Sequence, residues 1–355
     1  MSNPRVTHVC WTLGRAGAER MILDLAKRLP EHGFDVNIIS AGRGGELAAD
    51  IRAANIPLSI GPETRDRFKT LDFLRGEFSR KRPDVLHTHL GADVWAGYLA
   101  WRHRIRPWVI TAHSAKSYDA WLPGMLHRLA FRQADRVVCV SEAVRTFVKK
   151  TYGVHDDRLV VIPNGVDLAP IRERGSGSFQ DIPQLIVVGR LVPGKRVDLL
   201  LRALALVKRP WHLDIFGDGP ERGSLERLAE TLGMFPRVTF HGVSRDIFSE
   251  LPRADLFCFP TEQEGQGLAL FEAVGSGVPA VVSDLPVFRE AFDEQSMAYV
   301  DGSTPSAWAE SIERILQDPR PSLLRAAHAQ AIVRERYSVE RMVVAYAELY
   351  HEMLG

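Results

Sequence analysis

The chain has 355 residues, of which 45% are hydrophobic and 25% charged, so it is long enough for two ordinary globular domains. No apolar run approaches the roughly 20 residues that a membrane-spanning helix needs. Residues 1–11 also lack the charged stretch and apolar core of a signal peptide. We therefore expect a cytoplasmic protein, and with a net charge of +1 we expect no nucleic-acid partner.

Strand and helix patterns alternate along the first half. The strands are short, nearly continuous apolar runs, typical of a parallel sheet covered on both faces. The predicted strands are 6–13, 36–40, 84–89, 108–113, 136–141 and 158–164. The predicted helices between them are 18–29, 45–54, 67–80, 92–103, 122–132 and 142–152.

A stretch rich in Gly, Ser, Pro and charge (170–183) interrupts this alternation and indicates a linker. The pattern then restarts, which predicts two α/β domains with Rossmann-like parallel sheets and a ligand site at the carboxyl ends of the strands. The second set of strands is 184–191, 212–217, 237–242, 255–261, 279–284 and 297–302. The second set of helices is 197–207, 221–232, 246–250, 267–276, 305–317, 321–335 and 339–354.

Charge is unevenly distributed between the halves. Residues 1–165 hold 25 Lys and Arg against 17 Asp and Glu, whereas residues 166–355 hold 20 against 27. Either the first half faces an anionic partner, such as a phosphate-bearing acceptor or an acidic membrane, or two solvated surfaces differ by chance. Cys10, Cys139 and Cys258 lie singly in apolar runs, without the spacing of a zinc site or a disulfide, so we expect them to be buried.

The segment PTEQEGQGLALFE (260–272) follows one predicted strand and leads into a helix. Gly265 and Gly267 allow the backbone to approach a ligand, and the N–H groups of Gln266, Gly267 and Leu268 face outward at a helix N-terminus. This pattern predicts a phosphate site.

Two acids flank this phosphate site. Glu264 beside a bound phosphate is expected to contact an uncharged group, such as a sugar hydroxyl. Glu272 lies eight residues on, about two helical turns, and its carboxylate suits a ribose diol. The alternative is a helix-capping acid and a surface glutamate.

A second loop, GRLVPGK (189–195), carries Arg190 and Lys195 between a strand and a helix. Two cations there suit a diphosphate whose leaving charge must be neutralised, although solvated cations in a loop are a common alternative. The Walker pattern of ATP-binding loops is absent.

In the first half, Gly14 and Gly17 follow the first strand, but the third glycine of a dinucleotide-binding loop is missing. Strands also end in His87, His89 and His113, where side chains point toward a ligand crevice. These histidines are either functional or structural hydrogen-bonding groups, and no neighbouring carboxylate or thiol completes a metal site.

Several motifs in sequence order resemble retaining glycosyltransferases of family 4, which have the GT-B fold of two Rossmann-like domains facing across a cleft. The matching segments are GRAGAER (14–20), VSEAVR (140–145), IPNGVD (162–167), GRLVPGK (189–195), FGDGPE (216–221), FHGV (240–243), EGQGLALFE (264–272) and SGVPAVVSD (276–284). The chain departs from the family at Gln266, where an aromatic residue is frequent.

The resemblance implies a role for each motif residue. The implied catalytic residues are Glu264, His113, Arg190 and Lys195, with His113 touching the donor sugar and the two cations binding the diphosphate. The implied donor-binding residues are Gly14, Gly17, Arg190, Lys195, Gly217, Val243, Glu264, Gln266, Gly267, Leu268, Ala269 and Glu272. Among these, Gly217 and Val243 would line the base pocket. No cofactor or metal is implied.

The implied organisation has an acceptor-side domain (1–167), a linker (168–183) and a nucleotide-sugar domain (184–338), with 339–355 returning to the first domain. The implied reaction moves a sugar from a nucleotide-diphosphate sugar, with UDP favoured, to a glycan or lipid-linked acceptor of bacterial cell-surface polysaccharide or lipopolysaccharide synthesis. A GT-B sugar-nucleotide epimerase and a small soluble acceptor are the alternatives. Segment 68–82, with Phe68, Leu71 and Phe78, and segment 101–106 indicate either peripheral membrane contact or ordinary packing helices.

Overall fold

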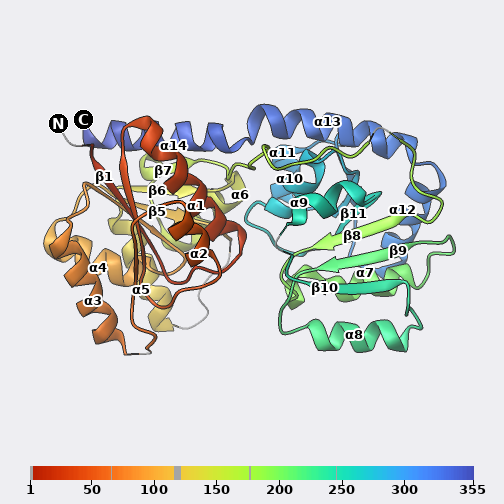
Figure 1. Cartoon of the computed structure of the whole chain (residues 1–355), viewed down its shortest axis with the longest axis horizontal. Coiled ribbons are helices and arrows are strands. Elements are labelled where there is room, and N and C mark those ends of the chain that lie inside the picture. Colours follow the sequence, from red (N-terminus) through yellow and green to blue (C-terminus); the bar gives the residue numbers. More distant parts are fainter. Residues whose placement is uncertain (1–2, 65, 116–120, 176, 245) are drawn as a thin grey trace. The chain divides into compact units, whose positions relative to one another are not determined.

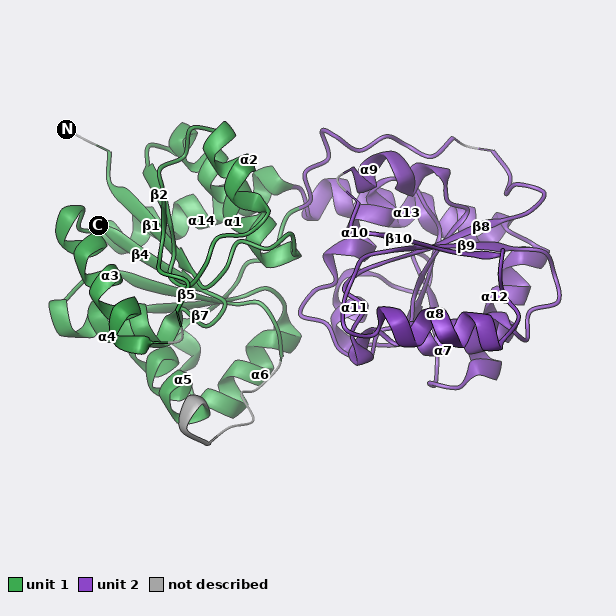
Figure 2. Cartoon of the chain, turned by 60° about the horizontal axis from the view of Figure 1, so that its bottom comes forward, with its two compact units in different colours: residues 1–165, 339–355 green, residues 166–338 purple. Residues whose placement is uncertain are grey.

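The structure, a computed structural model, describes residues 3–64, 66–115, 121–175, 177–244 and 246–355 (Figure 1). The chain divides into two compact units (Figure 2). Unit 1 comprises residues 1–165 and 339–355, and unit 2 comprises residues 166–338.

Unit 1 contains a seven-stranded parallel sheet in the order β3-β2-β1-β4-β5-β6-β7 among the described residues. Its strands are β1 (Arg5–Cys10), β2 (Asp35–Ser40), β3 (Leu58–Ile60), β4 (Val85–His89), β5 (Trp108–Ala112), β6 (Arg136–Cys139) and β7 (Leu159–Val161). Its helices are α1 (Gly17–Arg28), α2 (Leu47–Ala53), α3 (Arg67–Arg80), α4 (Asp93–His103), α5 (Trp121–Gln133), α6 (Glu142–Tyr152) and α14 (Val339–Leu354).

Alternating side chains of this sheet enter two cores. Val6 and Cys10 of β1 pack on the face covered by α1, α2 and α14, whereas Val9 packs on the face covered by α3 to α6. All five residues of β4 and of β5 are buried; β5 is apolar except for Thr111, whereas β4 also carries the buried polar residues His87, Thr88 and His89. The short strand β3 was not predicted, because its three residues carry no periodic signal.

Unit 2 contains a six-stranded parallel sheet in the order β10-β9-β8-β11-β12-β13 among the described residues. Its strands are β8 (Gln184–Val188), β9 (His212–Phe216), β10 (Val238–Gly242), β11 (Leu256–Phe259), β12 (Ala280–Ser283) and β13 (Ala298–Val300). Its helices are α7 (Val197–Leu204), α8 (Arg222–Thr231), α9 (Ile247–Glu250), α10 (Leu268–Gly275), α11 (Pro286–Ala291), α12 (Pro305–Gln317) and α13 (Arg320–Arg336).

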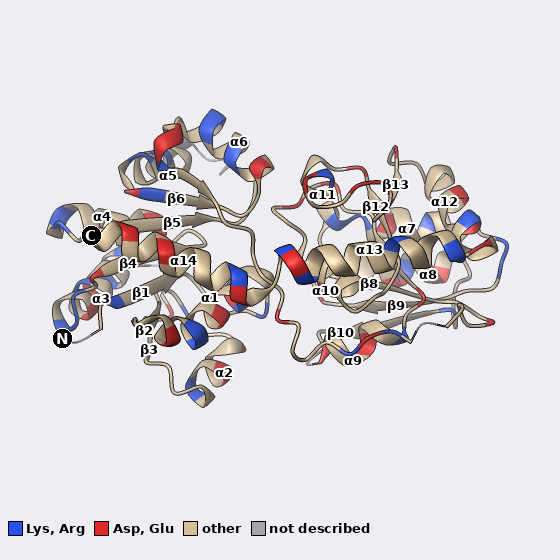
Figure 3. Ribbon diagram, turned by 90° about the horizontal axis from the view of Figure 1, so that it is seen from above, with Lys and Arg blue, Asp and Glu red and all other residues tan. Residues whose placement is uncertain are grey.

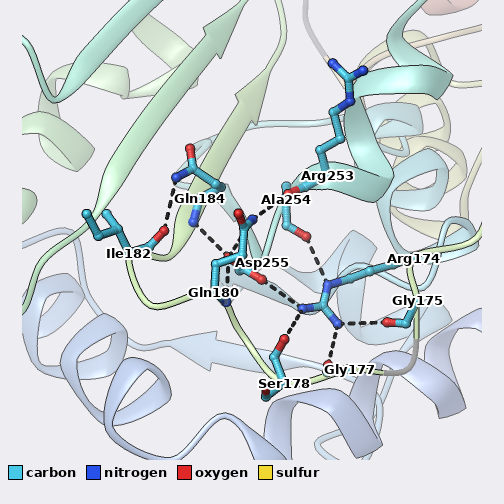
Figure 4. Close-up of polar contacts among 10 residues, drawn as sticks. All are labelled: Arg174, Gly175, Gly177, Ser178, Gln180, Ile182, Gln184, Arg253, Ala254 and Asp255. Carbon is cyan, nitrogen blue, oxygen red and sulfur yellow. Dashed lines mark hydrogen bonds and ion pairs between the residues drawn. The ribbon is translucent and has the colours of Figure 1, made fainter.

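The segment expected to be a linker (168–183) is part of unit 2, where Arg174 anchors it (Figure 4). The Arg174 Nη2 atom lies 2.8 Å from Asp255 Oδ1, and both side chains are almost fully buried. Asp255 Oδ2 also accepts from the backbone N–H of Gln184 at 2.9 Å. The other N–H groups of the guanidinium donate to backbone carbonyls of Ala254, Gly175, Gly177 and Ser178.

The five guanidinium N–H groups of Arg174 are therefore all used: three bonds join the segment to itself, and two join it to Ala254 and Asp255, directly before β11. Composition alone predicted a free linker, because the local sequence gives no sign of a partner 81 residues away. Cys10, Cys139 and Cys258 are buried free thiols, as predicted. No helix in the described part of the chain has both the length and the apolar character to cross a membrane.

Candidate active site

The predicted phosphate and cation loops of unit 2 lie at the carboxyl ends of β8 and β11, which are neighbours in the sheet. Chain order reverses between these two strands, and such a switch point is where open α/β sheets bind ligands. The sheet order thus brings together Arg190 and Lys195 after β8, Gly217 after β9, Val243 after β10, and Glu264 to Ala269 after β11.

Backbone hydrogen bonds hold these loops together. The N–H of Glu262 donates to the carbonyl of Gly194 at 2.9 Å, which joins the β11 and β8 loops. The N–H of Leu191 donates to the carbonyl of Asp218 at 2.9 Å, and the N–H of Glu221 donates to the carbonyl of Leu191 at 3.0 Å. These two bonds join the β8 and β9 loops, so the three loops form one preorganised surface.

Lys195 and Glu264 form an ion pair within this surface. The Lys195 side chain is 23% exposed and that of Glu264 only 10%, so the pair is largely shielded from water. The ammonium also lies 5.3 Å from the centre of the Phe259 ring, on its face. We expected Glu264 to contact an uncharged group, but without a ligand its nearest partner is this ammonium.

Arg190 and Arg196 differ in their environments. Arg190 is exposed, and its guanidinium makes no hydrogen bond or ion pair with any residue that the structure describes. Arg196 forms ion pairs with Glu262 and Asp198. Arg190 and Lys195 are thus the two cations of the loop placed to meet an anion. The guanidinium of Arg190 is already exposed to solvent, whereas the ammonium of Lys195 would have to leave the carboxylate of Glu264.

The predicted anion site corresponds to the start of α10. Gly267 is its N-cap in the left-handed conformation (φ 87°), with no side-chain cap. In the described part of the chain, the N–H groups of Gly267, Leu268 and Ala269 have no acceptor. Gln266 and Glu272 are buried beside them, each with polar contacts of its own. Three unpaired amides at a helix start favour a phosphate or another anion.

Substitution of Gly267 by alanine is expected to destabilise unit 2. An added Cβ would lie 2.8 Å from Phe288 Cε1 and 3.2 Å from Phe259 Cε1, in a backbone conformation that alanine avoids. Strain and overpacking together should lower the free energy of unfolding by about 2–4 kcal/mol. Urea unfolding measures the loss.

Gly223→Ala is the matched control. A Cβ at Gly223, in the first turn of α8, meets only the far end of the Arg227 side chain at 3.5 Å. This substitution should raise the unfolding free energy by up to about 1 kcal/mol. Equal stability of both variants would contradict the assignment of Gly267 as a required glycine.

The two residues predicted to line a base pocket, Gly217 and Val243, lie at the ends of β9 and β10. Gly217 has φ 133°, and an added Cβ would lie 1.9 Å from the carbonyl oxygen of Gly189. Val243 is 57% exposed at the end of β10. Next to them, the rings of Phe216 and His241 stack with centroids 4.4 Å apart. The sequence reasoning missed this stacked pair, which only the pairing of β9 with β10 brings together.

In unit 1, Gly14 and Gly17 lie between β1 and α1, at that sheet's own switch point between β1 and β4. The N–H of Arg15 donates to Glu46 at 3.1 Å, and its guanidinium pairs with Asp50 at 2.8 Å. Gly17 is the first residue of α1, whose N-cap has no side-chain hydrogen bond. The loop is therefore held in place by Glu46 and Asp50, at the start of α2 and within it. No side chain caps the N-terminus of α1.

The predicted histidines of unit 1 form a buried cluster with His8. His8 Nδ1 lies 3.1 Å from His89 Nε2, and His89 Nδ1 lies 3.3 Å from His113 Nε2. His87 bonds to the hydroxyls of Tyr350 at 2.6 Å and Thr111 at 2.7 Å. Burial lowers the pKa of His8 to about 3 and that of His113 to about 4, so both rings are neutral near pH 7.

Nitrogens of His8, His87 and His89 lie within 4.8 Å of one another, a spacing that could hold a metal ion. However, both His87 nitrogens already bond to hydroxyls, and the His8 and His89 nitrogens that face each other share a hydrogen bond. A metal would have to break these bonds, so the arrangement favours a hydrogen-bonded core. Sequence reasoning missed His8, which lies inside a strand and not at its end.

Two family models match the chain. Glycosyltransferase Family 4 matches residues 15–170, and Glycosyl transferases group 1 matches residues 182–318. A D-inositol 3-phosphate glycosyltransferase from Mycolicibacterium smegmatis is 31% identical over 74% of this chain and 67% of its own length. The enzyme of the same name from Xylanimonas cellulosilytica is 29% identical over 95% of this chain and 92% of its own length.

Solved structures resemble the whole chain. The crystal structure of HepE from Anabaena in complex with UDP and glucose superposes with a TM-score of 0.87 and 20% identity. The match covers 98% of this chain and 100% of HepE.

Proposed function

The chain belongs to the family 4 glycosyltransferases and has two Rossmann-like units of the GT-B type, and from this premise we propose that it transfers a sugar from a UDP-sugar with retention of anomeric configuration. The observation that carries the proposal is the β8–β11 switch point. There two cations and three unpaired amides converge, which is what a sugar nucleotide's diphosphate requires.

In the proposed donor complex, the diphosphate lies at the start of α10 with Lys195 and Arg190 beside it. Glu264 then accepts hydrogen bonds from hydroxyls of the donor sugar while its ion pair with Lys195 weakens. Glu272 accepts hydrogen bonds from the ribose hydroxyls. Gly217 and Val243 line the pocket of the base. UDP is favoured because HepE, a structural neighbour, has been crystallised with UDP and glucose.

The proposed reaction is a same-face substitution. The bond between the anomeric carbon and the diphosphate oxygen breaks as the acceptor oxygen bonds to the same carbon. The acceptor's proton passes to the departing phosphate oxygen. Lys195, Arg190 and the α10 N-terminus stabilise the developing charge, so catalysis depends on preorganised electrostatics. His113 is proposed to hydrogen-bond the donor sugar.

A thermal-shift experiment tests the donor assignment. Because a ligand that binds the native state raises its stability by RT ln(1 + [L]/Kd), UDP at about 100 Kd should add about 2.7 kcal/mol. The melting temperature should rise with UDP and UDP-sugars and change less with GDP or ADP. Absence of a shift with every nucleotide, at concentrations up to the millimolar range, would reject the proposed site.

The reaction class is tested with a donor that shifts the melting temperature. Transfer requires an acceptor, whereas a sugar-nucleotide epimerase would convert the donor alone into an epimer. The assay is run with EDTA, because two cations are proposed to neutralise the diphosphate without a metal. An epimer formed without acceptor, or activity lost in EDTA, would count against the proposal.

For the acceptor, we propose a lipid-linked glycan at an anionic membrane surface, as in bacterial cell-surface polysaccharide synthesis. The support is a surface on α3 to α5 with exposed Phe68, Tyr98, Trp101 and Leu129. Figure 3 shows lysine and arginine residues interspersed with acids on α3, and Arg102 at the end of α4 and Arg128 in α5 are exposed. This corrects the sequence interpretation of segment 68–82, since Phe78 is buried in the core, Leu71 packs partly buried against it, and Phe68 is 80% exposed.

The chain should co-sediment with phosphatidylcholine vesicles that contain phosphatidylglycerol, and salt should weaken the binding because surface charge is screened. Phe68→Ala with Trp101→Ala should reduce the bound fraction severalfold. Leu324→Ala, which removes an exposed side chain of α13 in unit 2, is the control and should bind as the unaltered chain does. Lack of binding at low salt would favour a soluble acceptor, such as the inositol phosphate in the names of the relatives.

A further inference from the structure

A cavity of about 420 Å³ lies beside the amino ends of β6 and β7 in unit 1. Its walls are formed by Arg132, Gly153, Val154, His155 and Arg158. Arg132 is in the last turn of α5, which leads into β6, and the other four residues follow α6 and precede β7. The loops proposed to bind the donor follow the carboxyl ends of strands, so this cavity is a separate site.

The backbone fixes the two arginines of this cavity. Nε of Arg132 donates to the carbonyl of Tyr152 at 2.8 Å, and Nη1 of Arg158 donates to the carbonyl of Arg132 at 2.9 Å. These carbonyls belong to the last turns of α6 and α5, so each arginine caps a helix end. An added Cβ at Gly153 would lie 2.5 Å from Arg132 Nη2, so the guanidinium lies directly against the backbone there.

Helix capping uses one N–H group of each guanidinium and leaves four on each. These remaining groups of Arg132 and Arg158 bond to no residue that the structure describes, and neither side chain pairs with a described carboxylate. The backbone N–H groups of Val154 and His155 also have no acceptor within the described ranges. The two aspartates that follow His155 do not line the cavity, and Asp156 already pairs with two cations of α6. The cavity therefore presents donors and positive charge without a compensating acid in its walls.

Helix α5 connects this cavity to exposed apolar side chains. Met125 and Leu129 are 48% and 54% exposed, and together with Arg132 they are spaced i, i+4 and i+7 on one face of the helix. Arg128 is exposed as well, and the sequence of α5 contains no aspartate or glutamate. Apolar residues beside cations are typical of a helix that lies in a membrane interface. Leu129 also belongs to the surface on α3 to α5 for which we propose membrane contact.

We propose that the cavity binds the phosphate group of an anionic phospholipid, with Arg132 and Arg158 as its ligands. Guanidinium groups bind phosphate oxygens through pairs of charge-assisted hydrogen bonds. A volume of 420 Å³ is in the range of small-molecule sites, so a headgroup fits and not only a free phosphate ion. The membrane contact rests on the proposed function, whereas phosphate binding in the cavity is a property of unit 1 alone.

Nuclear magnetic resonance of the full chain labelled with ¹⁵N-arginine tests this proposal without any nucleotide or acceptor. The Arg132 Nε–H group is bonded to a carbonyl, so it should exchange slowly with water and give a signal that Arg132→Gln removes. The two probes are dihexanoylphosphatidylglycerol below its micelle concentration and inorganic phosphate. We expect a saturable shift with each. The lipid should saturate at a concentration about tenfold lower, because its acyl chains contact Leu129.

Two substitutions separate a built site from general attraction between charges. Arg158→Gln should weaken lipid binding about tenfold, the effect of losing charged hydrogen bonds. Gly153→Ala keeps every charge but displaces the Arg132 guanidinium, and it should weaken binding severalfold. Arg52→Gln removes an exposed arginine of α2 in the same unit and is the matched control, with unchanged affinity. Far-UV circular dichroism confirms that each variant is folded at the temperature of the titration.

Three results would overturn the proposal: no shift with the lipid, inorganic phosphate that binds as tightly as the lipid, or equal weakening by Arg158→Gln and Arg52→Gln. The second result would identify a site for free anions, and the third would show only general attraction. Sugar transfer is measured separately. If the chain transfers no sugar but binds the lipid as expected, the proposed function fails and the cavity assignment stands. If it transfers sugar and the Arg132 signal does not shift, the reverse is concluded.

Discussion

Lys195→Met is expected to lower kcat for sugar transfer by about 10²–10³-fold, the range typical of losing one preorganised group that stabilises transition-state charge. The methionine keeps an unbranched stem against the ring of Phe259, so packing is retained while the charge and its ion pair with Glu264 are lost. Donor KM should change less than kcat, because the charge on the leaving diphosphate grows as the glycosidic bond breaks. Steady-state kinetics with the donor found by thermal shift measures both.

Lys208→Met is the matched control for this charge removal. Lys208 is an exposed lysine of unit 2 that lies between α7 and β9, outside the switch-point loops. Its variant should keep kcat within about twofold, since surface substitutions away from special features have small effects. A Lys195→Met enzyme that is folded and as active as this control would remove Lys195 from the mechanism.

Arg174→Ala is expected to lower the free energy of unfolding of unit 2 by about 3–5 kcal/mol, the cost of breaking a buried ion pair by removing one partner. The substitution leaves the Asp255 carboxylate buried without its cation, and it leaves carbonyls of Ala254, Gly177 and Ser178 without their donor. Arg174→Lys should recover only part of the loss, because an ammonium has three donors where the guanidinium has five.

Arg253→Ala controls for the loss of a nearby guanidinium. Arg253 pairs with Glu250 at 3.1 Å, but its side chain is 74% exposed. An exposed pair contributes between 0 and about 1 kcal/mol, so this variant should unfold at nearly the same urea concentration as the unaltered chain. Similar losses for both variants would show that the buried network of Figure 4 does not hold segment 168–183 in place.

The fold could be predicted from the sequence largely because its strands are parallel and buried on both faces. Strands such as β5 and β11 consist almost entirely of apolar residues, and amphipathic helices separate the strands along the chain. The ends of elements were less certain. The first strand was expected to reach Leu13 but ends at Cys10, because the carbonyl of Leu13 already accepts from Leu47 in the following loop.

The features of the candidate site that lie within one loop could be predicted from the sequence. The contacts between loops could not, because they depend on which strands are neighbours in the sheet. Glycines and cations between a strand and a helix indicated the anion site around Gly267 and Lys195. The pairing of Lys195 with Glu264, 69 residues apart, follows from the adjacency of β8 and β11. In unit 1, local sequence could not identify His8 or Tyr350 as partners of the strand-end histidines, since β1 and α14 bring them there.

Helix α14 also has a consequence for the order in which the protein matures on the ribosome. Its Tyr346 and Tyr350 close one face of the unit 1 sheet through hydroxyl contacts to Thr111 at 3.0 Å and His87 at 2.6 Å. At about 5–20 residues per second, this helix is synthesised roughly ten seconds or more after residue 165. The histidine cluster of residues 1–165 therefore stays uncovered until α14 has been synthesised. Unit 2 is one contiguous segment of the chain and can finish folding before unit 1 does.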